Sequence, residues 1–264
     1  MLTLVGRSLR RVAPANLGLA AVLGGFQFLL VAVAASYERA GSFDQLAMLL
    51  PAFAQQAFGT AMTSFAGMAT VGFYETGIVL IVALFAIFVA AEPAGDVEAG
   101  FVDMILARPL PRHWMVTRSL LAMTVATLIL ALTMGASLWI ALLALAPAGA
   151  RWPEPRIILT LIAHLITVSC CFGAAAVAAA GWARRRATAL APVALAALAL
   201  YLIDFLGAWW TAMPNISRIS PFHYYQGAAI VEGRANTLLD LAILGAAILA
   251  ASAVAYWQFG RRDL

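Results

Sequence analysis

The chain has 264 residues, of which 64% are hydrophobic and 11% are charged, and its formal net charge is +4. Soluble domains are nearer half apolar and a quarter charged, so this chain has too few polar residues to cover a soluble surface. All 16 basic residues are arginine. Without lysine there is no phosphate-binding GxxxxGK[ST] loop and no lysine Schiff base, so any ATP hydrolysis must come from another subunit.

Six apolar segments are long enough to cross a bilayer, whose hydrocarbon core of about 30 Å takes roughly 20 helical residues. They are residues 16–36, 76–95, 119–147, 157–183, 188–210 and 237–258. The sequence therefore predicts an all-α polytopic membrane protein in which residues 1–264 form a single transmembrane domain. Residues 1–12 mix leucine with arginine and predict an interfacial helix that leads into the first span.

The arginines predict the orientation of these spans. With the amino terminus inside, eleven arginines lie in inner segments and five in outer ones, which favours both termini in the cytoplasm. Their dispersal at the ends of apolar runs fits anionic lipid headgroups and topology signals better than nucleic acid. Arginine without lysine, together with abundant alanine, suggests a GC-rich bacterial genome, so the expected location is the bacterial inner membrane.

Two outer segments are longer than plain turns. Residues 37–75 are moderately apolar and contain Pro51 with repeated glycine and phenylalanine, so they are interpreted as interfacial or re-entrant. The alternative is a seventh, broken span. Residues 211–236 are aromatic and amphipathic and are predicted to cap the outer face.

The inner loop after the second span carries the most distinctive pattern. Its acidic residues come first and its basic residues last, an order that complements the dipole of a helix. Phe101, Met104 and Ile105 fall at i, i+3 and i+4 and predict a short apolar stripe, and Pro109 and Pro111 end the helix. A short amphipathic helix with such a stripe is suited to docking in a groove of another protein. The alternative is an ordinary solvated loop whose charges only set topology.

This loop resembles the first cytoplasmic loop of ABC-2 type permeases, the membrane subunits of ABC transporters. The resemblance lies in Glu92, Gly100, the apolar run 101–106 and the ending 107–112, which reads ARPLPR. The loop departs from the family in Pro111, where the family often has serine. Residues 219–225 (ISPFHYY) resemble the SPF-aromatic segment before the last span of the same family.

The resemblance implies a coupling helix that contacts a separate ABC ATPase subunit. It also implies a second permease subunit, in a homodimer or heterodimer, and export as the direction of transport. The implied ATPase-coupling residues are Glu92, Asp96, Glu98, Phe101, Met104, Ile105, Arg108 and Arg112. The alternatives are a stand-alone secondary transporter or channel, a membrane enzyme, or a membrane assembly factor. Because no nucleophile–base constellation is found, the chain is expected to be non-catalytic, with no cofactor and no metal.

His164 and Asp204 are ionisable residues inside predicted spans, and such residues are functional candidates in membranes. Both are expected about 10 Å below the outer boundary, where they could pair. One interpretation is an interhelical hydrogen bond that stabilises the bundle; the other is a contact with a proton or substrate. The adjacent Cys170 and Cys171 are interpreted as packing residues.

Overall fold

The computed structural model describes residues 2–43, 45, 48, 63–98, 113–183, 185–209 and 216–261. In this part the chain is helical, without a strand, and six of its segments are long and apolar enough to cross a membrane. The helices that build these segments are α1 (Leu2–Ala40), α4 (Phe65–Tyr74) with α5 (Thr76–Ala90), α8 (His113–Leu145), α9 (Pro155–Ala180), α10 (Arg186–Trp209) and α12 (Thr237–Arg261). The prediction of an all-α multi-pass membrane protein is confirmed.

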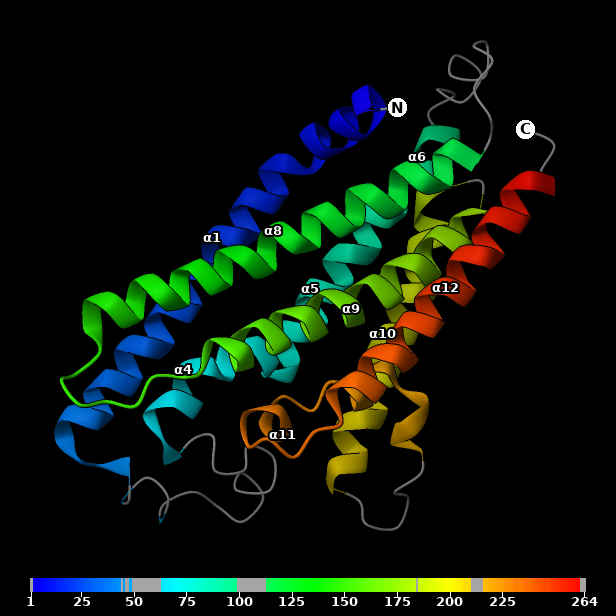
Figure 1. The fold of residues 1–264 in the computed structure, drawn as a ribbon. Helices are drawn as coiled ribbons and strands as arrows, with labels where there is room; N and C mark the ends of the chain where they lie inside the picture. Colours follow the sequence, from blue (N-terminus) through cyan, green and yellow to red (C-terminus); the bar gives the residue numbers. More distant parts are fainter. Residues whose placement is uncertain are drawn as a thin grey trace.

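The six segments form an elongated bundle in which α1 begins and α12 ends at the same end (Figure 1). Helix α1 packs along α8, and α9 packs against α5, α8, α10 and α12. In its most apolar window α9 is 67% buried, whereas the corresponding windows of α10 and α12 are only 11% buried. Helix α9 is therefore the centre of the bundle, and the apolar outer faces of α10 and α12 are left to the surroundings.

Helix α1 is longer than the predicted first span. Its 39 residues correspond to about 58 Å, nearly twice the hydrocarbon thickness of a bilayer. Residues 2–12, predicted as an interfacial helix leading into the span, are helical, but they are continuous with the span even though Pro14 lies inside the helix.

The second span begins earlier than predicted, at Phe65 instead of residue 76. The Ser64 side chain caps α4 by accepting a hydrogen bond from the Gly67 amide at 3.2 Å. The carboxylate of Glu75 caps α5 in the same way, accepting from the Ile78 amide at 2.9 Å. Residues 65–74, predicted as interfacial or re-entrant, are thus a buried helix of the second span. Most of the remaining predicted outer segment, 44–62, lies outside the described residues.

Side-chain hydrogen bonds to backbone carbonyls join the long helices. The Asn16 amide donates to the Ala126 carbonyl at 3.1 Å, and the Ser137 hydroxyl donates to the Gly24 carbonyl at 2.5 Å. Both bonds link α1 to α8. Polar side chains commonly join helices in membranes, where few other partners exist for them.

Residues 216–236 cover the end of the bundle away from the termini, as predicted for a cap. They form two 3₁₀ turns, η2 (Ser217–Ile219) and η3 (Pro221–Tyr224), and helix α11 (Gly227–Val231). The ring of Phe222 packs on that of Phe172, with centroids 4.8 Å apart. The buried Tyr225 hydroxyl lies 2.7 Å from the Phe73 carbonyl and 3.1 Å from the Leu161 carbonyl. The SPF segment therefore anchors this cap to α4 and α9.

Candidate functional site

The connection that follows α5 begins with the short helix α6 (Glu92–Glu98), at the bundle end that holds both termini (Figure 1). Helix α6 packs closely against the neighbouring helices because the contact is made by small side chains. These are the buried alanines Ala91, Ala94, Ala180, Ala183 and Ala189. The start of the predicted coupling loop is therefore seated on the bundle, against the turn between α9 and α10.

Asp96 links α6 to two other helices. Its carboxylate accepts from the Arg118 guanidinium of α8 at 2.5 Å, and both side chains are less than 10% exposed. The second carboxylate oxygen lies 3.7 Å from the guanidinium of Arg11 in α1, which is 55% exposed. The Arg118 contact is the stronger of the two, because water screens the exposed Arg11.

Arg186, the first residue of α10, holds α6 from the other side. Its backbone amide donates to the Glu98 carboxylate at 2.9 Å, and its guanidinium donates to the Phe88 carbonyl at 2.9 Å. The guanidinium also lies over the Phe88 ring, 4.3 Å from its centroid. The aliphatic stem passes so close to Gly95 that an added Cβ there would lie 3.3 Å from Arg186 Cδ. One arginine thus contacts the ends of α5, α6 and α10.

We call this cluster the α6 clamp. It consists of Arg11, Glu92, Asp96, Glu98, Arg118 and Arg186. It contains three acids and three arginines, and this balance matters because burying an unpaired charge is costly. Glu92 is only 6% exposed, and its Oε2 atom has no hydrogen-bond partner within the described residues. The clamp can hold the start of the loop in a fixed position relative to four helices.

Three of the eight predicted coupling residues lie in the clamp. Glu92 and Asp96 are buried and Asp96 faces arginines, while Glu98 is exposed. The other five predicted residues lie outside the described residues; they are Phe101, Met104, Ile105, Arg108 and Arg112. The sequence did not predict that Arg118 and Arg186 are the partners of the acids. The available signal was that the six-span topology brings the acids of the loop and most of the arginines to the same end.

His164 and Asp204 are both described, and no hydrogen bond or ion pair joins them. His164 is fully buried; its Nδ1 lies 2.9 Å from the Thr160 carbonyl, and its ring stacks on Tyr225 with centroids 5.8 Å apart. Because a carbonyl only accepts, Nδ1 carries the proton, and Nε2 has no hydrogen-bond partner among the described residues. Asp204 instead lies near His223, with its carboxylate 3.7 Å from Nδ1. The η3 turn brings His223 and Tyr225 to these helices, which sequence position alone did not reveal.

His223 lies outside the spans, in η3. Burial and the nearby Arg218 guanidinium lower its pKa, and the Asp240 carboxylate opposes this shift. At 3.7 Å, Asp204 is beyond ordinary hydrogen-bond distance. His223 is therefore uncharged at neutral pH. The same end holds the buried Tyr225, whose pKa is raised above its ordinary value by burial.

The six apolar helical segments and the partly buried charges at their ends define a multi-pass α-helical membrane protein. No protein-family model matches the chain, and no curated protein matches it. The function therefore has to be argued from the sequence pattern of the loop and from the way the bundle holds its first turn.

Proposed function

We propose that the chain is the transmembrane permease subunit of an ATP-driven ABC transporter of the ABC-2 type, acting in export. A separate ATPase subunit hydrolyses ATP, and the inner loop, residues 92–112, couples that hydrolysis to movement of the spans. A second permease subunit, identical or different, completes the substrate path. The membrane is the inner membrane of a bacterium, with both termini in the cytoplasm.

The α6 clamp is the observation that carries this proposal. A loop that only connects two spans has no need of a buried ion pair at its base such as Asp96–Arg118, since buried charges cost free energy unless they are well paired. Here α6 is tied to α8 through Arg118 and to α10 through Arg186, with a further contact to Arg11 of α1. A force applied to the loop is therefore passed to several spans at once.

The clamp and the apolar stripe have different roles in the proposal. Asp96 is turned into the bundle, so it positions α6 and does not contact the partner. The surface offered to the ATPase comes from the residues that follow α6, including the predicted stripe of Phe101, Met104 and Ile105. An amphipathic helix held at a fixed base is suited to docking in a groove.

Co-purification tests the docking step. The tagged chain is expressed with candidate ABC ATPases of its source organism, solubilised in mild detergent and purified. We expect the wild type to retain one ATPase and the variant F101D/M104D/I105D to lose it. The matched control is I216D/I219D, which adds the same kind of charge to exposed isoleucines at the other end of the bundle.

Gel-filtration profiles of the three proteins show whether each variant stays folded. If the ATPase binds the wild type and the stripe variant equally well, the loop is not its docking site. If no ATPase binds, a stand-alone transporter becomes the better explanation, and transport without ATP would then be the next measurement.

A further inference from the structure

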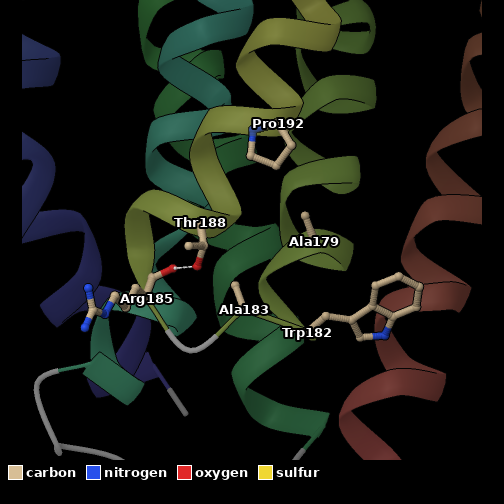
Figure 2. A pocket seen from close by; sticks show the side chains of 6 residues that line it. All are labelled: Ala179, Trp182, Ala183, Arg185, Thr188 and Pro192. Atoms are coloured by element: carbon tan, nitrogen blue, oxygen red, sulfur yellow. Dashed lines mark hydrogen bonds between the residues drawn. The ribbon is translucent and has the colours of Figure 1, made fainter.

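A groove lies between the end of α9 and the start of α10, at the same end of the bundle as the α6 clamp (Figure 2). Its volume is about 520 Å³. The residues that line it are Ala179, Trp182, Ala183, Arg185, Thr188 and Pro192. Apart from Arg185 and the Thr188 hydroxyl, which already donates to the Arg185 carbonyl at 2.7 Å, the side chains of this lining are apolar or aromatic.

Trp182 forms one side of the opening and is 76% exposed. Its indole is nevertheless held in place. With the Gln258 amide oriented so that its nitrogen donates to the Ala178 carbonyl at 2.6 Å, the Gln258 oxygen accepts from Trp182 Nε1 at 3.2 Å. A tryptophan at the end of a membrane span typically lies at headgroup level, with an apolar body and a polar tip.

Arg185 lies on the other side of the opening, just before α10, and its guanidinium points away from the other lining side chains (Figure 2). Among the described acids of this end, Asp96 pairs with Arg118, Glu98 accepts from the Arg186 amide, and Glu92 is buried in the α6 clamp. Among the described residues no carboxylate pairs with the Arg185 guanidinium. The groove therefore combines an apolar floor with an arginine that pairs with no carboxylate of the described residues.

We propose that this groove binds one anionic phospholipid, with its phosphate on Arg185 and an acyl chain along Ala179 and Pro192. Basic pockets between transmembrane helices at the cytoplasmic side are suited to anionic headgroups. The site does not depend on the proposed ATP-driven function.

Trp182 provides the measurement, because brominated acyl chains quench the fluorescence of a tryptophan that they contact. The chain is reconstituted in phosphatidylcholine vesicles that contain a small fraction of brominated phosphatidylglycerol or of brominated phosphatidylcholine. The chain has seven tryptophans, so the signal of Trp182 is the difference between the wild type and Trp182→Phe. We expect about fivefold stronger quenching of this signal by the anionic lipid, the enrichment that one arginine near a membrane surface provides.

Two variants separate a built site from general contact with the membrane. Arg185→Gln removes the cation and should abolish the preference for the anionic lipid, whereas Arg151→Gln, an exposed arginine at the other end, should preserve it. Ala179→Phe fills the groove and should reduce quenching by the anionic lipid. Equal quenching by both lipids in the wild type, or an unchanged preference in Arg185→Gln, would overturn the proposal. Protection of Trp182 from both lipids would overturn it as well and would indicate a second subunit over the groove.

Discussion

At the residue scale, Asp96 is the charge on which the α6 clamp depends, because it is the buried partner of Arg118. Replacing Asp96 with asparagine keeps the shape but leaves the Arg118 guanidinium buried without a counter-charge. Breaking a buried pair in this way lowers the free energy of unfolding by about 3 kcal/mol. We expect this loss for Asp96→Asn in thermal and denaturant unfolding of the detergent-solubilised protein.

Glu154→Gln is the control for that measurement. Glu154 is exposed, and its side chain makes no capping hydrogen bond at the start of α9, so its neutralisation should change stability by less than about 0.5 kcal/mol. Equal stability of the two variants would show that the Asp96–Arg118 contact contributes nothing to the fold.

His223 is expected to make stability depend on pH. Its pKa is lower in the folded protein than in the unfolded chain, so the unfolded chain binds the proton more readily. Its contribution to stability is therefore complete above its ordinary pKa of about 6.5 and is lost as the pH falls below that value. In melting curves between pH 8 and about pH 5, we expect His223→Gln to lose less stability on acidification than the wild type.

Replacing His113 with glutamine provides the comparison, because His113 is an exposed histidine at the opposite end. Its variant should follow the wild-type pH profile. Parallel profiles for His223→Gln and the wild type would mean that the η3 histidine does not control the acid side of the stability curve.

The contacts of individual residues were predicted less well than the spans. The acids of the loop and the arginines of the span ends were both recognised, but Asp96 and Arg118 are 22 residues apart, and their pairing depends on where the connection between α5 and α8 returns. His164 and Asp204 were both recognised as ionisable residues in spans. Their actual neighbours are Tyr225 and His223, from the η3 turn and the residue that follows it. The position of this turn depends on how it packs against the helices, and the local sequence does not predict that packing.

At the element scale, the helices α8, α9, α10 and α12 lie where their apolar runs predicted them, to within a few residues at most ends. Long apolar runs bounded by proline or arginine are strong signals for spans. The start of the second span was missed because residues 37–75, which end at Glu75, were interpreted as an outer interfacial or re-entrant segment. The carboxylate of Glu75 instead caps α5 in the middle of a longer span. The cap gives the carboxylate a hydrogen-bond donor and gives the first turn of the helix an acceptor for its Ile78 amide.

Arg186 is predicted to hold α6 against α10, and hydrogen exchange can test this. Arg186→Ala removes the bond to the Phe88 carbonyl, the cation–π contact and the stem that lies against Gly95. We expect the backbone amides of α6 to exchange about tenfold faster, which corresponds to about 1.4 kcal/mol, because the Arg186 stem packs on Gly95 of α6 and its guanidinium fixes the end of α5 that precedes α6. Mass spectrometry of peptic peptides that contain residues 92–98 provides the measurement.

Arg185→Ala is the matched control for this exchange experiment, since Arg185 is the adjacent arginine but makes none of these contacts with α5 or α6. Exchange in α6 should be unchanged in that variant. Equal protection of α6 in both variants would show that the buried alanines hold the helix without help from Arg186.

At the scale of the whole molecule, the bundle has two ends of different charge. Of the described arginines, seven lie at the end with the termini and five at the other end; the seven are Arg7, Arg10, Arg11, Arg118, Arg185, Arg186 and Arg261. At the other end Arg39 donates to the Leu145 carbonyl, and Arg234 pairs with Glu232. Since arginine-rich ends remain in the cytoplasm, the end with the termini and the α6 clamp is expected to face inward.

Cysteine labelling in whole cells tests this orientation. The native Cys170 and Cys171 are buried in the bundle, so they form a low background. With a membrane-impermeant maleimide, we expect Ala148→Cys, in the exposed turn between α8 and α9, to react in intact cells. Arg10→Cys, on an exposed position of α1 at the other end, should react only after the membrane is opened. The reverse pattern would place the α6 clamp outside the cell, where no ATP-hydrolysing subunit could reach it, and would exclude the coupling role.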